Sequence, residues 1–206
     1  MMNSKEHWER IYSTRLHTEV SWYQATPKVS LDFVRDLQIA KDAAIIDVGG
    51  GDSCLADHLL EAGFTNITVL DISEAAINRA RLRLGPKAGL INWIVGDITK
   101  FDPAIQFDFW HDRAVFHFLT TKEQANKYLG VANKALSASG KIVIGTFSEK
   151  GPKSCSGLQI KQYSETTLTA LIKKWFHKIK CIRADHITPF NTIQNFLFCS
   201  FKKAID

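Results

Sequence analysis

Three aspartates stand at the ends of three short apolar runs, and three glycines follow the first of them. Asp47 lies in the segment 45–53, IIDVGGGDS, while Asp71 and Asp97 close the next two runs. If these runs are neighbouring parallel strands, their carboxyl ends meet at one edge of a sheet, where open α/β sheets bind ligands. Carboxylates accept hydrogen bonds from amino and hydroxyl groups. The pattern therefore predicts a site for a polar small molecule rich in such donors.

The turn after the first run favours close approach of a ligand to the backbone. It consists of Gly49, Gly50 and Gly51, and we expect a helix to begin near Asp52 or Ser53. Backbone N–H groups at such a helix start can hold a ligand carboxylate. Asp47 suits a ligand with a positive amino-acid head, such as the methionyl ammonium of a sulfonium methyl donor. The alternative is a plain tight turn, although three consecutive glycines carry an entropic cost that a plain turn does not require.

The second and third aspartates fit the remainder of a nucleoside ligand. Asp71, followed by Ile72, is placed to accept both hydroxyl protons of a ribose. Asp97, followed by Ile98, is placed to accept from an adenine amino group, with the isoleucine flanking the ring. A helix-capping role for Asp71 stays open, because the segment SEAAINRA that follows has a helical pattern.

A nicotinamide dinucleotide is the competing ligand. Its fingerprint G-x-G-x-x-G requires a third glycine. Gly49 and Gly51 fit this spacing, but Cys54 stands at the third position, and no catalytic Tyr-x-x-x-Lys is found. Asp71 does not discriminate, because both ligands contain a ribose. A nicotinamide-dependent oxidoreductase is therefore the alternative hypothesis, and a domain that binds the donor without catalysis is a third.

Alternating strand and helix patterns must position these residues. Five runs are typical of strands, at 43–48, 66–71, 89–95, 107–112 and 141–147, and helical patterns fill 53–63, 73–85 and 121–140. The strand-like runs 179–188 and 195–201 are joined through Pro189 without a helix, which indicates a hairpin. We expect an α/β fold: a doubly wound, seven-stranded mixed sheet with the last strand antiparallel and helices on both faces.

The chain length suits one domain covering residues 1–206. Residues 1–40 are expected to form a helical lid, with two helices over the ligand end, and residues 41–206 a Rossmann-like core.

From about residue 40 to residue 203, the sequence resembles class I S-adenosylmethionine-dependent methyltransferases. The resemblance rests on the glycine turn and on the three strand-end acids in the same order; SASGKIVIGTF (137–147) is similar to the family's fifth strand, with Ala-Ser-Gly in place of Pro-Gly-Gly. It implies S-adenosylmethionine as the cofactor. The segment WHDRAVFHFLT together with residues 151–164 resembles an uncharacterised bacterial branch of the family.

The fourth strand ends in His111, Asp112 and Arg113. In the family this strand end faces the transferable methyl group, and the Asn/Asp-Pro-Pro-Tyr motif of some relatives is absent here. Asp112 could orient an amine acceptor or take its proton, and His111 could act as a general base. Arg113 could bind an acceptor carboxylate as a two-pronged donor. Internal ion pairs or hydrogen bonds are the alternative for all three residues.

The N-terminal segment 8–24, WERIYSTRLHTEVSWYQ, resembles part of a group that includes protein-lysine methyltransferases. There it forms a lid, in which Trp22 and Tyr23 could cover the sulfonium or an acceptor cation by cation–π contact; core packing is the alternative. Two acceptor classes thus remain: a small, carboxylate-bearing molecule, which we slightly favour, and a protein lysine.

The amino-acid composition indicates which partners, which location and which cysteine chemistry to expect. Residues 1–103 hold 11 Lys/Arg and 14 Asp/Glu, whereas residues 104–206 hold 15 and 7, so the second half carries a charge of +8. This basic half could attract an acidic substrate, but no nucleic-acid arm, membrane segment or signal peptide is apparent, and we expect a cytoplasmic enzyme. The cysteines are Cys54, Cys155, Cys181 and Cys199; without a CxxC pair they predict free thiols and no metal site. Oligomeric state is not indicated.

Overall fold

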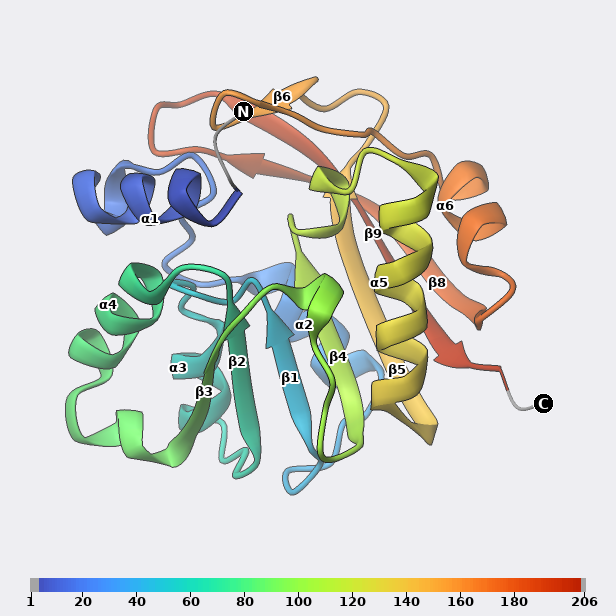
Figure 1. Ribbon diagram of the computed structural model, residues 1–206, viewed down its shortest axis with the longest axis horizontal. Helices are drawn as coiled ribbons and strands as arrows, with labels where there is room; N and C mark the ends of the chain where they lie inside the picture. Colours follow the sequence, from blue (N-terminus) through green and yellow to red (C-terminus); the bar gives the residue numbers. More distant parts are fainter. Residues whose placement is uncertain (1–3, 205–206) are drawn as a thin grey trace.

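The computed structural model describes residues 4–204, and a seven-stranded sheet forms its centre (Figure 1). Its strands, in the spatial order β3-β2-β1-β4-β5-β9-β8, are β3 (Ile91–Val95), β2 (Ile67–Asp71), β1 (Ile45–Val48), β4 (Phe107–Arg113), β5 (Leu136–Phe147), β9 (Ile193–Lys203) and β8 (Phe176–Ile187). The first five run parallel, and β9 lies antiparallel between β5 and β8. The predicted mixed sheet with an antiparallel last strand is confirmed.

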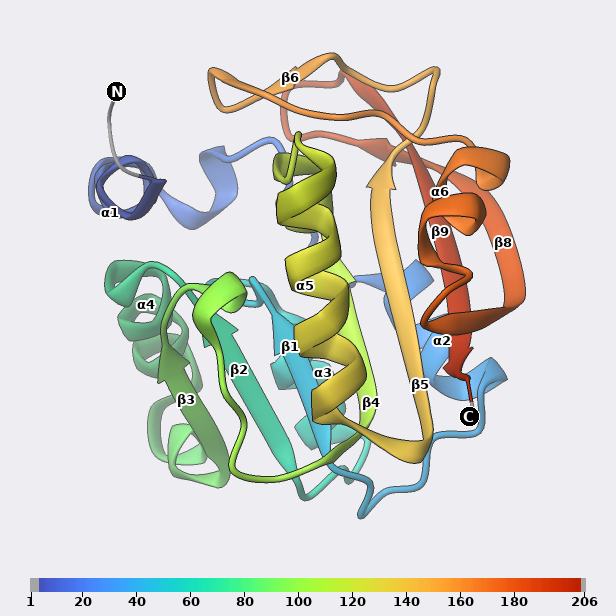
Figure 2. The same ribbon diagram turned by 45° about the vertical axis from the view of Figure 1, so that its right-hand side comes forward.

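Helices cover both faces of the sheet (Figure 2). One face packs against α5 (Lys122–Ala135) and α6 (Glu165–Ile172), and the other against α2 (Lys28–Asp36), α3 (Leu55–Glu61) and α4 (Glu74–Leu84). Short 3-10 segments lie at η1 (His17–Glu19), η2 (Gly85–Leu90), η3 (Ile98–Lys100) and η4 (Phe116–Phe118). The doubly wound architecture follows from strands that are apolar on both sides and must bury both. No residue range was predicted for helix α6.

Side-chain alternation along β4 divides its residues between the two faces. Phe109 belongs to the core beneath α2 and α3, and His111 on the same side contacts Ser30 of α2. Trp110 belongs to the opposite core, and Asp112 on that side contacts Tyr128 of α5. Consecutive residues at the end of β4 therefore serve different parts of the molecule.

The first helix of the N-terminal segment lies over the carboxyl ends of the strands (Figure 1), whereas α2 packs on a face of the sheet beside α3. The expectation of two helices over the ligand end therefore does not hold for α2. Glu9 of α1 (Ser4–Thr14) accepts hydrogen bonds from the backbone N–H groups of Glu74 and Ala75, at 2.6 and 3.0 Å, and from the Ser73 hydroxyl. A carboxylate at this position satisfies unpaired N–H groups and favours the positive end of the α4 dipole. Glu9 thus fastens the lid to α4.

The cysteine prediction is wrong for one pair. Cys181 of β8 faces Cys199 of β9 in the antiparallel register, with Cα atoms 4.1 Å apart, and the two form a disulfide. The spacing of the cysteines along the chain gave no sign of this register. Cys54 and Cys155 are free thiols. The cysteine pattern therefore does not by itself indicate a reducing compartment.

The loop at residues 151–164 contains a short two-stranded ribbon, β6 (Ser154–Cys155) with β7 (Leu158–Gln159). Apart from this ribbon and an isolated bridge between Tyr163 and Ser148, the loop contains no strand or helix. Within residues 4–204, no helix combines the length and the apolar composition needed to cross a membrane.

Replacing Glu9 with alanine should loosen the lid. We expect Glu9→Ala to lower the free energy of unfolding by about 1–2 kcal/mol, because the N–H groups at the start of α4 lose their acceptor. Glu6→Ala, which removes an exposed glutamate from the same helix, is the matched control. Urea denaturation measures both variants, and equal stability of the two would contradict the capping role.

Candidate active site

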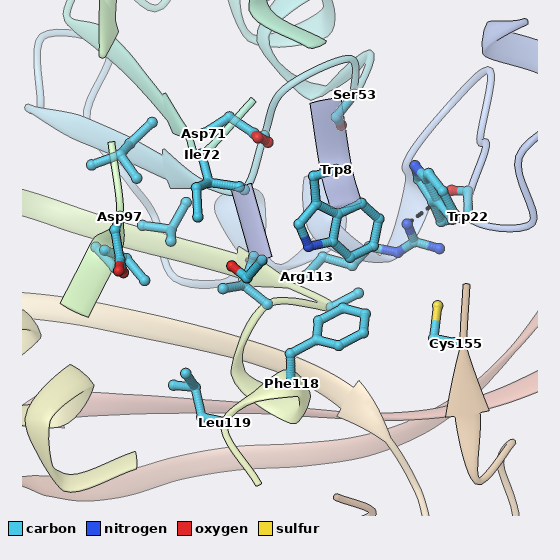
Figure 3. A pocket seen from close by; sticks show the side chains of 18 of the residues that line it. Trp8, Trp22, Ser53, Asp71, Ile72, Asp97, Arg113, Phe118, Leu119 and Cys155 are labelled. Atoms are coloured by element: carbon cyan, nitrogen blue, oxygen red, sulfur yellow. Dashed lines mark hydrogen bonds between the residues drawn. The ribbon is translucent and has the colours of Figure 1, made fainter. Parts of the chain in front are cut away.

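A cavity of about 840 Å³ opens above the carboxyl ends of β1 to β4, beneath α1 and the β6–β7 ribbon (Figure 3). Most of the predicted site residues line it: Asp47, Gly49, Gly50, Ser53, Asp71, Ile72, Asp97, Ile98, Trp22, Tyr23, His111 and Arg113. Gly51 and Asp112 do not. The volume lies in the range of small-molecule sites.

The glycine turn brings the backbone against two carboxylates. Gly49 has φ = 67°, a left-handed conformation that L side chains rarely adopt. A Cβ atom added to Gly51 would stand 2.5 Å from Asp71 Oδ2, and one added to Gly50 would collide with Asp47 Oδ2. Gly51 therefore does not line the cavity, but its lack of a side chain leaves room for the Asp71 carboxylate. The turn forms a cradle that any side chain would fill, which fits a ligand bound closely to the backbone.

The helix after the turn begins at Leu55, slightly later than expected. Ser53 Oγ accepts from the Leu55 N–H at 3.1 Å and so takes one of the unpaired donors at this helix start.

Asp47 is held by a buried hydrogen-bond chain that spans three elements. Its Oδ1 lies 2.7 Å from His111 Nδ1, and His111 Nε2 lies 2.8 Å from Ser30 Oγ. All three side chains are almost inaccessible. These hydrogen bonds fix the orientation of Asp47 and leave its Oδ2 on the side of the glycine turn.

The other two acids also have defined partners. Asp71 Oδ1 accepts from the Ser73 N–H at 2.8 Å, while Oδ2 lies beside Gly51. Burial, followed by the charges of Asp47 and Glu9, raises the pKa of Asp71 to about 7. Asp97 Oδ1 accepts from the Thr99 N–H and hydroxyl, at 2.9 and 2.8 Å, and caps η3. In each case one carboxylate oxygen is engaged by the protein.

Asp112 does not face this cavity, which corrects the prediction that it meets the acceptor. Its Oδ2 accepts from the Tyr128 hydroxyl at 2.6 Å, and its Oδ1 accepts from the N–H groups of Val115 and Phe116 at 2.9 and 3.3 Å. These bonds fix the turn that leaves β4 through Ala114, which has φ = 74°. The alternative of an Asp112–Arg113 ion pair is also not found among the described residues.

Arg113 lines the cavity with a guanidinium that is only partly satisfied (Figure 3). Its Nη1 donates to the Trp22 carbonyl at 3.0 Å, and its head lies 4.9 Å from the centre of the Phe196 ring. Nε and Nη2 are buried, and no residue within 4–204 accepts from them. Burial lowers the pKa of Arg113 to about 10, so the group is cationic at neutral pH.

Aromatic rings beside Trp22, which were not predicted from the sequence, line the cavity near this cation (Figure 3). Trp8 contacts Trp22 and Phe118, with ring centres 5.7 and 5.2 Å apart, and Tyr12 extends the cluster. Cys155 of β6 lines the same cavity and lies below the head of Arg113, to the right of Phe118, in Figure 3. Trp8 was inside the lid segment that the sequence indicated, whereas nothing local pointed to Phe118 or Cys155.

A charge cluster also missed from the sequence joins the glycine turn to α4. Asp52, almost fully buried, lies 3.1 Å from Arg79 Nη2 and 2.7 Å from Arg83 Nη1. Arg83 also pairs with Asp57, and Arg79 donates to the Tyr12 carbonyl of the lid. The spacing of Arg79 and Arg83, four residues apart on one helix face, was the available signal. The cluster ties turn, helix and lid together.

Comparisons with known proteins agree with this geometry. A family model described as a methyltransferase domain matches residues 46–142. This segment is similar to methyltransferase domains. EEF1A lysine methyltransferase 2 of Mus musculus is 24% identical over 159 residues, which cover 69% of this chain and 65% of that protein. Malonyl-(acyl-carrier protein) O-methyltransferase 1 of Ilyobacter polytropus is 30% identical over 112 residues, 53% of this chain and 40% of the relative. The chain thus spans less than two thirds of these relatives' lengths.

Solved structures of methyltransferases share the fold. The N-methyltransferase NodS of Bradyrhizobium japonicum WM9, in complex with S-adenosyl-L-homocysteine, has a TM-score of 0.67 and 18% identity, covering 96% of this chain and 98% of that one. The 1,6-didemethyltoxoflavin-N1-methyltransferase of Burkholderia thailandensis has a TM-score of 0.71 and 17% identity, covering 98% and 84%. Solved structures at these identities show the predicted fold, and the match of residues 46–142 bears out the predicted resemblance to S-adenosylmethionine-dependent methyltransferases.

The donor-binding residues predict a pH-dependent affinity. A ribose hydroxyl donates best to an ionised carboxylate, and a pKa of about 7 leaves Asp71 half protonated at that pH. We expect the affinity for S-adenosylhomocysteine to fall as the pH drops from 8 to 6, by up to roughly tenfold per unit below the pKa. Calorimetry measures it. Asp71→Asn should bind more weakly with a flatter profile; a flat profile in the unmodified protein would contradict the assignment.

Asp112 should matter for stability. Asp112→Ala is expected to lower the free energy of unfolding by about 2–4 kcal/mol, because three buried donors lose their acceptor. Affinity for S-adenosylhomocysteine should stay within about threefold, since the side chain does not reach the cavity. Asp112→Asn, which keeps an acceptor oxygen, should lower the free energy of unfolding by less than Asp112→Ala does. An Asp112→Ala protein of normal stability that has lost turnover would restore the acceptor role.

Proposed function

We propose that this protein transfers a methyl group from S-adenosylmethionine to a small acceptor that Arg113 holds by a carboxylate. The observation that supports this proposal is the buried guanidinium in the cavity, with two nitrogens lacking a partner among the described residues. An unpaired buried cation costs free energy, and an anionic ligand relieves that cost. Arginine also presents two parallel donors that match a carboxylate.

The residues present fit the donor. The glycine cradle accommodates its backbone-bound part, and Asp47 Oδ2 is available to the methionyl ammonium. Asp71 is proposed to accept from the ribose hydroxyls, and Asp97, flanked by Ile98, from the adenine amino group. S-adenosylmethionine, when bound, supplies a methyl group on a positively charged sulfur. The protein's task is to bind, orient and exclude water, and positioning alone can contribute roughly 7–11 kcal/mol to lowering the barrier.

A protein lysine is the second candidate acceptor. The relatives named as lysine methyltransferases favour it, and the rings of Trp8 and Trp22 could pack around an ammonium. Arg113 opposes it, because a second cation in the same cavity is repelled at low dielectric. The relative named as an O-methyltransferase is compatible with a carboxylate acceptor. The relatives and structures reported above are named as methyltransferases, which favours the proposal over the nicotinamide hypothesis, and location in the cytoplasm stays a prediction.

Substitution of Arg113 tests the proposal. We expect Arg113→Met to raise the KM for the acceptor about 100-fold or more, the effect of losing a two-pronged charged contact. Its affinity for S-adenosylhomocysteine should stay within about threefold. Lys153→Met removes an exposed cation near the same ribbon and is the control.

Acceptors are identified first with isotope-labelled donor, incubated with a small-metabolite pool and, separately, with a protein pool. If Arg113→Met loses donor affinity as strongly as acceptor affinity, the guanidinium holds the donor's own carboxylate and the proposal is wrong. Label in the protein pool alone would instead favour the lysine acceptor.

A further inference from the structure

The cavity wall near Arg113 lacks an available proton acceptor among residues 4–204. Both ring nitrogens of His111 are engaged, one by Asp47 and one by Ser30. Asp112 belongs to the opposite face of the sheet, where Tyr128 and two backbone groups occupy its oxygens. Neither of the two residues that the sequence suggested as bases is free to take a proton from an acceptor.

Apart from Asp47, the other titratable groups that we find facing Arg113 are held neutral. His117 accepts from the Phe147 N–H at 3.3 Å, and burial lowers its pKa to about 3. His186 of β8 lies 2.7 Å from the Ser21 carbonyl, and burial followed by the charge of Arg113 lowers its pKa. Burial raises the pKa of the Cys155 thiol. Asp47 is an anion that faces Arg113; its Oδ1 is bonded to His111, and the proposed function assigns its Oδ2 to the donor's ammonium.

This environment discriminates between kinds of nucleophile. An amine arrives as an ammonium at neutral pH, and it must lose a proton before it can attack. Here it would do so without a base, beside a buried guanidinium and a positively charged sulfur. A carboxylate arrives deprotonated, and both positive charges attract it.

We propose that the carboxylate held by Arg113 is itself the methyl-accepting group, so that the product is a methyl ester. This inference rests on the proposed function and specifies its accepting atom. A carboxylate oxygen supplies the electron pair of the new C–O bond. The electrons of the broken C–S bond remain on the donor's sulfur, which becomes a neutral thioether. No proton is released or taken up.

The geometry of the Arg113 guanidinium is compatible with a bound carboxylate that attacks the methyl group. Nη1 is bonded to the Trp22 carbonyl, which leaves Nε and Nη2 as the two donors for an anion. Each carboxylate oxygen has two acceptor sites, so a hydrogen-bonded oxygen keeps a lone pair for attack. The rings of Trp8 and Phe118 line the same cavity and suit an apolar acceptor body.

The same geometry requires movement of the lid. Nε and Nη2 are covered in this structure, so an acceptor reaches them only when the segment carrying Trp22 or the β6–β7 ribbon shifts. Donor binding and acceptor binding are therefore expected to alter protection of this segment from hydrogen exchange.

Binding is tested with two probes of the same shape, 4-phenylbutyrate and 4-phenylbutylamine, by calorimetry on the protein saturated with S-adenosylhomocysteine. We expect the carboxylate to bind at least about tenfold more tightly, and Arg113→Met to abolish this preference while Lys153→Met retains it. Equal or tighter binding of the amine, or a preference unchanged in Arg113→Met, would overturn both the role of Arg113 as the anchor of the acceptor carboxylate and the inference of a methyl ester.

The accepting atom is tested separately by product chemistry. Labelled methyl donor is incubated with the protein and a small-metabolite extract, and the products are treated with mild base. A methyl ester releases its label as volatile methanol, and turnover at saturating donor should be constant from pH 7 to 9. Label that resists base, or turnover that rises about tenfold per pH unit as for an amine losing its proton, overturns the ester while leaving the Arg113 anchor intact. A pool with no base-labile label also overturns it.

Discussion

The alternation of side chains along β4 decides how this site is built. His111 and Arg113 project toward the face of α2 and α3, and Asp112 between them projects toward α5. One strand end thereby supplies a support for Asp47, a cation for the cavity and an acceptor for the turn that follows. Because the period of a strand is two, none of these roles can be exchanged by a local rotation.

On the donor side of the cavity, close packing around the glycine turn positions the binding residues. The backbone passes so near Asp47 and Asp71 that a Cβ atom at Gly50 or Gly51 would overlap their carboxylate oxygens. The acids are therefore placed by backbone path and by their hydrogen-bond partners. Asp52, paired with Arg79 and Arg83, fixes the turn to α4, and Glu9 fixes the lid to the same helix. The lid and the donor site are consequently both fastened to α4.

The periodic and motif-bearing parts of this architecture were predictable from the sequence. Buried strands have apolar runs of recognisable length, and a glycine turn followed by acids at successive strand ends is typical of a nucleoside-binding edge. Asp112 was misplaced because neighbouring residues were treated as one cluster, although alternation along a strand was enough to separate them. The unsatisfied guanidinium of Arg113 had no local signal, since it depends on which side chains from distant segments fail to reach it. The Cys181–Cys199 bond likewise follows from register between two strands, which spacing in the sequence does not encode.

Arg113 connects the fold to the proposed chemistry, and a crystal structure with S-adenosylhomocysteine and 4-phenylbutyrate tests that connection most directly. The account predicts the acceptor carboxylate on Nε and Nη2 of Arg113, at about 2.7–3.0 Å, with the donor's ammonium beside Asp47. One carboxylate oxygen should point at the sulfur of S-adenosylhomocysteine. Arg113 bound instead to the carboxylate of S-adenosylhomocysteine, with 4-phenylbutyrate elsewhere, would contradict it.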